Sequence, residues 1–155
     1  MAKALWGLER LDIFKGLNAM EMQEITKIVS KVRYGKGDII AEEENSREVF
    51  VLIDGSVDIM SQAGVPLYRI SKGEAFGELA MVASLRRTAR AVCREDSWIL
   101  VMNINHLETV GDENPEVFRI VSGNIVQSLG VKLARANKLI ELLKTELARA
   151  LKSKD

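Results

Sequence analysis

The sequence predicts an α+β protein in which helices at both ends flank a body of short antiparallel strands. Between Val32 and Met102, short apolar runs recur at steps of about 8–12 residues with turn signals between them, which indicates a β-sandwich or barrel. No proline follows Pro115, and apolar residues there keep helical spacing. We therefore expect two parts: residues 1–113, with N-terminal helices and the β-body, and residues 114–155, a long C-terminal helix.

The N-terminal segment has the pattern of helices. Apolar residues between positions 5 and 14 fall on one helical face, and Gly16 ends that run. Asn18 and Glu21 then form the pattern of a capping box, in which each side chain accepts from the other residue's backbone N–H. This pattern predicts a helix that continues through residues 25–29.

The central part has the pattern of strands and turns. Gly35–Asp38 and Gly64–Pro66 are predicted turns, Asp54-Gly55 is a strong hairpin signal, and residues 42–48 are a predicted polar loop. The predicted strands are 32–34, 39–40, 49–53, 57–59, 67–70, 89–94 and 97–102.

Composition excludes several classes of protein. The chain has 155 residues and a formal net charge of zero, so no basic excess points to nucleic acid. Cys93 is the only cysteine, which rules out an internal disulfide and fits a reducing, cytoplasmic setting. We find no signal peptide, no apolar run long enough to cross a membrane, and no pattern of a metal site or catalytic residues.

A motif that starts at residue 76 suits an anion. Gly77 lets the backbone approach a ligand closely, and the N–H groups of a helix starting there have no partners within that helix. Arg87 lies nine residues after Glu78, so a short turn of helix could return its guanidinium to the same place, and Thr88 adds a hydroxyl. In isolation, Arg87 could equally be a surface residue or could pair with Glu78.

Glu78 does not fit a site for phosphate alone, because a carboxylate repels phosphate. A carboxylate does accept hydrogen bonds from hydroxyl groups. A ligand that carries a phosphate next to a ribose would use both Glu78 and Arg87.

Phe76–Ala80 followed by Arg87–Ala89 resembles the phosphate-binding cassette of cyclic nucleotide-binding domains, and the order of strands and turns resembles that family over residues 8–130. The resemblance implies an eight-stranded antiparallel β-roll of the jelly-roll type, as in CRP/FNR-like effector domains. It implies that Glu78 binds the ribose 2′-hydroxyl and that Gly77, Arg87 and Thr88 bind the cyclic phosphate of cAMP or cGMP. The full set of ligand-binding residues expected from it is Phe76, Gly77, Glu78, Leu79, Ala80, Arg86, Arg87, Thr88 and Ala89.

Two departures from the family pattern concern the base and the phosphate. Eukaryotic relatives often have proline where this chain has Arg86, which adds a positive charge. Lys132 and Leu133 stand near the positions of a Thr-Ser pair that contacts adenine in the catabolite-activator branch. The sequence therefore does not predict which base is recognised. The Arg-Arg-Thr-Ala setting of Thr88 resembles channel-type cassettes, which accept both cAMP and cGMP.

The C-terminal helix has a heptad pattern. Asn114 and Pro115 suit its first positions, and apolar residues then recur at alternating steps of three and four over residues 126–150. A helix packed on its own chain and a parallel coiled coil between two copies are both possible, and we favour the homodimer. Gly130 is a weak point, either a hinge or a close approach to another backbone.

The sequence thus predicts a cyclic nucleotide sensor without enzymatic activity. The alternatives are a ligand-free scaffold for a protein partner on the same fold, and a truncated transcription regulator. Bacterial regulators of this family continue into a helix-turn-helix, for which no residues remain after Asp155, so we expect no DNA binding by this chain. We expect Cys93 and Trp98 in the core, and for His106, at a strand–helix junction, a structural or surface role.

Overall fold

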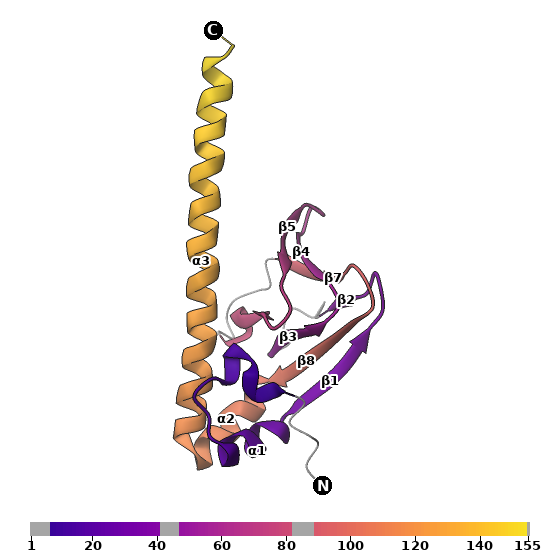
Figure 1. Ribbon diagram of the computed structural model, residues 1–155, viewed down its shortest axis with the longest axis vertical. Helices are drawn as coiled ribbons and strands as arrows, with labels where there is room; N and C mark the ends of the chain where they lie inside the picture. The colour runs from indigo at the N-terminus through magenta and orange to yellow at the C-terminus, as the bar shows by residue number, and fades with distance from the viewer. Residues whose placement is uncertain (1–6, 41–46, 82–88, 155) are drawn as a thin grey trace.

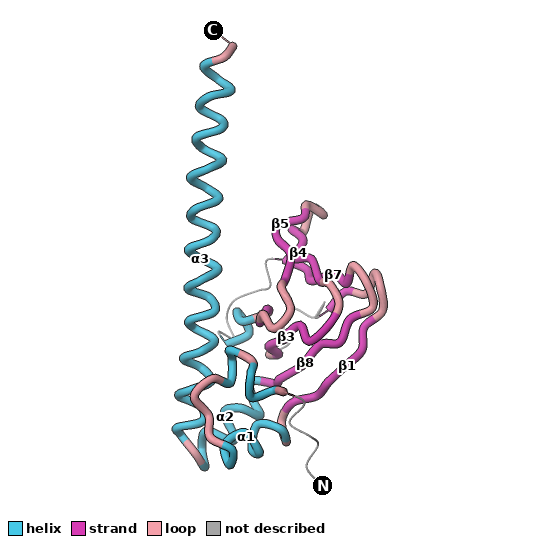
Figure 2. Tube along the Cα trace, in the orientation of Figure 1, coloured by secondary structure: helices cyan, strands magenta, loops and turns pink. Residues whose placement is uncertain are grey.

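A computed structural model describes residues 7–40, 47–81 and 89–154. Figure 1 shows a β-roll beside the lower part of one long helix, α3 (Pro115–Lys152), whose upper part extends beyond the roll. The N-terminal helices lie at the base of the roll next to α3, as the tube in Figure 2 also shows. The predicted α+β class and the long C-terminal helix are confirmed.

The roll consists of two four-stranded antiparallel sheets. One has the order β1-β8-β3-β6 and the other the order β2-β7-β4-β5. The strands are β1 (Val29–Tyr34), β2 (Ile39–Ile40), β3 (Glu48–Asp54), β4 (Val57–Ser61), β5 (Pro66–Ile70), β6 (Ala75–Phe76), β7 (Ala89–Cys93) and β8 (Ser97–Asn103). The eight-stranded antiparallel roll implied by the family resemblance is therefore confirmed.

The Asp54-Gly55 turn does not close a hairpin, contrary to the strong signal in the sequence. β3 pairs with β8 and β6, whereas β4 pairs with β5 and β7, so the turn carries the chain from one sheet to the other. Gly35–Asp38 makes the same kind of crossing between β1 and β2. A turn dipeptide determines where the chain bends, but the pairing of the strands depends on which faces they bury.

β3 lies at the centre of the hydrophobic core. Its residues Val49 to Leu52 are all buried, although side chains of successive residues point to opposite faces. Val49 and Val51 join a cluster with the helices, and Phe50 and Leu52 join a second cluster inside the roll. This strand therefore has a continuous apolar run, because both of its faces are covered.

The N-terminal segment is less helical than its pattern predicts. Residues 8–14 form two 3-10 turns, η1 (Leu8–Arg10) and η2 (Asp12–Phe14), with Leu11 extended between them (ψ 136°). The extended residue allows Leu8, Ile13 and Phe14 to reach the core together. Leu5 of the predicted helical face lies outside the described residues.

Helix α1 (Ala19–Thr26) begins as predicted but ends early. The capping box is present, since Glu21 N donates to Asn18 Oδ1 and Asn18 N donates to Glu21 Oε1, both at 2.9 Å. The predicted continuation through residue 29 is wrong, because Val29 is the first residue of β1 and pairs with Met102. Tertiary pairing with β8 overrides the helical spacing there.

Helix α2 (Ile104–Glu113) follows β8 at the strand–helix junction expected near His106, although the sequence predicts no bounds for it. It begins at Asn103, whose side chain accepts a hydrogen bond from Asn105 N at 2.8 Å, and it packs closely against α3. A Cβ atom on Gly111 would lie 2.7 Å from Phe118 Cβ, so the two helices approach through a glycine. Asn114 has no capping side-chain bond, although its position before Pro115 suits a cap.

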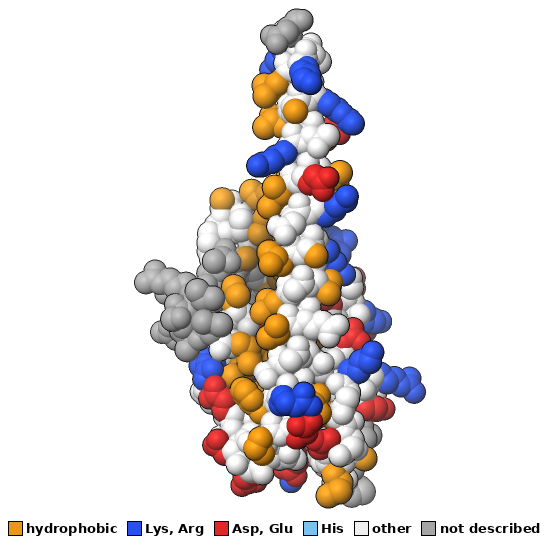
Figure 3. Space-filling model, turned by 90° about the vertical axis from the view of Figure 1, so that its left-hand side faces the viewer, with side chains coloured by type: hydrophobic (Ala, Val, Ile, Leu, Met, Phe, Trp, Pro, Cys, Tyr) orange, Lys and Arg blue, Asp and Glu red, His pale blue; other side chains and the backbone are white. Residues whose placement is uncertain are grey.

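Helix α3 changes its surroundings along its length. Its first turns bury Val117, Val121 and Ile125 in the cluster that includes the N-terminal helices. All of residues 133–154 are exposed, and Figure 3 shows hydrophobic side chains along one face of the helix. The helix runs unbroken through Gly130, where a Cβ atom would meet nothing within 4 Å among the described residues, so Gly130 is not a close approach to any described segment of the chain.

Among the described residues, no helix is both long and apolar enough to cross a bilayer. No group of three or more His, Cys, Asp or Glu side chains in that same part of the chain is arranged to hold a metal ion.

Candidate functional site

The candidate site begins at β6, which connects the two halves of the core. Phe76 pairs with Phe50 across β3 and β6, and their rings stack with centroids 5.3 Å apart. Phe76 is buried inside the roll, whereas the preceding Ala75 is buried in the cluster with the helices. The backbone that follows is therefore anchored on both sides of the sheet.

Gly77 turns the chain away from β6. Its φ of 75° lies in the left-handed region, which glycine adopts without the steric penalty of a Cβ atom. The 3-10 turn η3 (Glu78–Met81) follows, and Ala80 N donates to Gly77 O at 3.1 Å. The predicted helix start is thus a single 3-10 turn in the described part of this segment.

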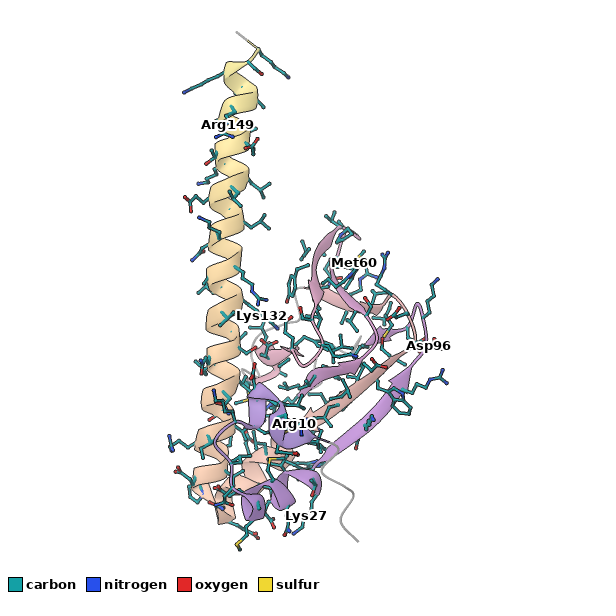
Figure 4. All side chains as sticks on the ribbon, in the orientation of Figure 1. Arg10, Lys27, Met60, Asp96, Lys132 and Arg149 are labelled. Atoms are coloured by element: carbon teal, nitrogen blue, oxygen red, sulfur yellow. The ribbon has the colours of Figure 1, made fainter. Side chains whose placement is uncertain are left out.

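Glu78 is a buried carboxylate with partners on α3. Its side chain is 2% exposed, and the ammonium of Lys132 lies 2.6 Å from Oε1. Ser128 Oγ donates to Oε2 at 3.3 Å, and Lys132 also donates to the carbonyl of Ala75. Figure 4 shows Lys132 on the side of α3 that faces the roll, so the long helix is bonded to the carboxylate expected to bind ribose.

A second link joins this segment to α2 through Arg47. The guanidinium of Arg47 donates to Ala80 O at 3.4 Å, to Asn105 Oδ1 at 2.5 Å and to Glu108 Oε1 at 2.9 Å. This ion pair lowers the pKa of Glu108 below its ordinary value. Sequence reasoning missed Arg47, because it lies in the predicted polar loop and its three partners are distant in the chain.

The structure brings together part of the predicted set. Phe76 to Ala80 form one continuous corner, and Ala89 begins β7, where it pairs with Ser61 of β4. Arg86, Arg87 and Thr88 lie outside the described residues. The two positions expected near the base, Lys132 and Leu133, have different surroundings. Lys132 contacts Glu78, while Leu133 is 63% exposed.

Other residues considered in the sequence have simpler surroundings. Trp98 is 39% exposed with the Lys31 ammonium 5.1 Å from its ring, so its expected place in the core is wrong. Cys93 is buried in the roll as expected, and burial raises the pKa of its thiol. His106 is exposed on α2.

The charges of the site extend to the neighbouring β5. Burial raises the pKa of Tyr68 to about 12, and the negative charges of Glu78 and Glu74 add to the shift.

A groove of about 670 Å³ borders the same lysine. Its walls come from η1 and η2, the turn between β5 and β6, and α3, with Ala75, Ser128 and Lys132 at its edge. None of residues 76–80 lines it, so this groove is separate from the corner that Glu78 occupies.

Comparison with known proteins supports the fold described above. The family model described as "Cyclic nucleotide-binding domain" matches residues 31–114. Potassium channel KAT1 of Oryza sativa subsp. japonica is 26% identical over 124 residues, which are 77% of this chain and 17% of the channel. A cAMP-dependent protein kinase regulatory subunit of Debaryomyces hansenii is 31% identical over 83 residues, which are 53% of this chain and 18% of that protein.

The fold matches solved structures over most of the chain. A cyclic nucleotide-binding domain from Methylobacillus flagellatus superposes with a TM-score of 0.78 at 16% identity, over 87% of this chain and 82% of that one. This chain spans less than a fifth of the length of the channel and of the kinase regulatory subunit.

Proposed function

Because the chain belongs to the cyclic nucleotide-binding domain family, we propose that it is a regulatory module without enzymatic activity that binds cAMP or cGMP. Residues 1–113 sense the nucleotide, and residues 114–155 carry the signal as an output helix. The buried carboxylate of Glu78 supports this proposal most strongly, because it follows the left-handed Gly77 and is bonded directly to α3.

Each part of the nucleotide has a proposed partner. Glu78 accepts a hydrogen bond from the ribose 2′-hydroxyl, and the backbone at Gly77 binds the cyclic phosphate with Arg87 and Thr88. Arg86 adds positive charge beside the phosphate. The anchored position of Phe76 supports these assignments, since it holds the corner that presents Gly77 and Glu78.

The Arg87→Ala variant is expected to bind cAMP and cGMP about 10- to 150-fold more weakly, the loss that corresponds to one charged hydrogen bond. Isothermal titration calorimetry on ligand-stripped protein measures it. Arg90→Ala is the matched control, because Arg90 is nearby in the chain but donates to Gln62 O at 2.8 Å. Equal affinity of both variants and the original protein would remove Arg87 from the phosphate site. No heat with either nucleotide at millimolar concentration would overturn the proposed function itself.

We further propose that two copies associate through residues 126–150 of α3 as a parallel coiled coil. Leu133, Ile140, Leu143 and Leu147 are each 51–63% exposed and occupy heptad positions that face a common side. An apolar line of this length in water favours association with a second identical helix. The buried Cys93 and the lack of a second cysteine fit the reducing cytoplasm that we propose for this dimer.

The Leu143→Glu variant is expected to shift the protein from dimer to monomer at micromolar concentration, because it places a charge in the apolar seam. Leu142→Glu is the control. Leu142 is 53% exposed on the same helix but is not at an a or d position of the heptad, so the dimer should persist. Size-exclusion chromatography with light scattering measures the mass. A monomeric original protein contradicts the dimer, whereas loss of the dimer in both variants contradicts the proposed seam.

A ligand-independent interaction protein is the second candidate. The ion pair between Glu78 and Lys132 favours it, because both charges are already partnered without a nucleotide. The calorimetry described above separates the two candidates, since this second function predicts no heat with cAMP or cGMP in a folded dimer.

A further inference from the structure

The contacts of Glu78 leave no open path to its carboxylate. The side chain is 2% exposed, and Lys132 and Ser128, one helical turn apart on α3, each bond one of its oxygens. The Lys132 side chain is itself only 15% exposed, whereas Lys138 on the same helix is 69% exposed. A hydroxyl group from outside can reach Glu78 only if a neighbouring group moves.

Lys132 is the neighbour most able to move. Its ammonium ends a flexible chain of four methylene groups, while Phe76 and Gly77 belong to the anchored corner next to β3. A second ion pair between α3 and the roll joins Arg135 to Glu74 at 3.4 Å; the Arg135 side chain is 67% exposed and that of Glu74 is 15% exposed. Because this pair is longer and its guanidinium is mostly in solvent, its attraction is weaker than that of Lys132 and Glu78, so Lys132 is the main polar attachment of this part of α3 among the described residues.

We propose that Lys132 is a latch and a selectivity residue of the nucleotide site: its ammonium occupies the place of the ribose 2′-hydroxyl at Glu78. A ligand with that hydroxyl displaces Lys132 and frees residues 128–135 of α3 from the roll. This inference rests on the proposed nucleotide binding. The two events are linked, so the ion pair that holds α3 against the roll weakens binding of the ribose. Binding of the ribose weakens the attachment of α3 by the same free energy.

The test compares cAMP with 2′-deoxy-cAMP. In the original protein, cAMP must break the ion pair, whereas the deoxy ligand leaves it in place, so the two affinities should be similar. In Lys132→Met, cAMP should bind on the order of tenfold more tightly or better, the scale of one charged hydrogen bond, and the deoxy ligand should be unchanged. Lys138→Met is the control and should change neither affinity. Tighter binding of both ligands, or weaker binding of cAMP, would overturn the latch.

A measurement without ligand tests the attachment separately. Lys132→Met should raise hydrogen exchange in residues 75–81 and 128–135 at least severalfold, and Lys138→Met should not. Because the methionine variant leaves Glu78 buried without its ion-pair partner, the Lys132→Met/Glu78→Gln double variant provides a folded reference with the same expected gain in exchange. Unchanged hydrogen exchange in both Lys132 variants would show that Lys132 does not attach α3 to the roll. If exchange rises but no protein binds either nucleotide, the proposed function fails while the attachment stands, and Lys132 is then no selectivity residue.

Discussion

Replacing Phe76 with alanine is expected to lower the free energy of unfolding by about 3–5 kcal/mol, the usual cost of removing a fully buried phenylalanine ring. The ring is 2% exposed and stacks on Phe50 inside the roll. The surrounding strands belong to two different sheets, so they cannot easily close the space that the ring leaves. Chemical denaturation followed by circular dichroism measures the change.

The matched control for Phe76 is Trp98→Ala. It removes an even larger ring, but one that is 39% exposed and contacts the Lys31 ammonium on the surface. Its expected cost is smaller, with a cation–π contribution of about 0.5–1 kcal/mol. If both variants lost equal stability, the roll interior would not be packed as described. Phe76→Leu retains most of the apolar volume and should recover part of the loss, which keeps the test usable if Phe76→Ala does not fold.

Replacing Gly55 with alanine is expected to lower the free energy of unfolding by about 2–5 kcal/mol, from two causes of similar size. The φ of Gly55 is 107°, a conformation that costs a residue with a Cβ atom about 1–2 kcal/mol. The added Cβ would also lie 2.2 Å from Ser97 Oγ and 2.7 Å from Asp96 O, and overpacking of this kind costs about 1–3 kcal/mol.

Gly64→Ala separates these two causes. Gly64 also has a positive φ, 83°, but a Cβ atom there meets nothing within 4 Å in the part of the chain that the structure describes. Its variant should therefore show only the backbone cost, about 1–2 kcal/mol. Equal losses in the two variants would mean that the Gly55 turn has room for a side chain, and that the crossing between the sheets is not as close as described.

The corner at residues 76–80 could be expected from the sequence, but its surroundings could not. Gly77 and Glu78 are adjacent, so their order alone indicates a backbone turn beside a carboxylate. The sequence gives no comparable signal for Lys132, which is 54 residues away from Glu78, or for Arg47, which connects the corner to α2. Lys132 entered the sequence reasoning only as a possible neighbour of the base, whereas it contacts the carboxylate.

Local chemistry was sufficient for the elements whose cause lies within a few residues. Asn18 and Glu21 cap α1 as predicted, the apolar run at residues 49–53 is the core of a strand, and Pro115 begins a long helix. These features depend on backbone hydrogen bonds and side-chain spacing that any surrounding fold would preserve. The motif at residues 76–80 belongs to the same class, since its glycine and carboxylate are contiguous.

Burial and pairing between distant segments decided the rest. The end of α1 depends on the pairing of Val29 with Met102, and the turn at Gly55 crosses between sheets because β3 and β4 bury their side chains against different partners. The ion pair between Glu78 and Lys132 exists because α3 passes beside the corner at the position of Lys132. These features depend on the free energy gained when apolar faces are covered and charges are paired across the whole fold. No short stretch of residues contains both partners of such contacts.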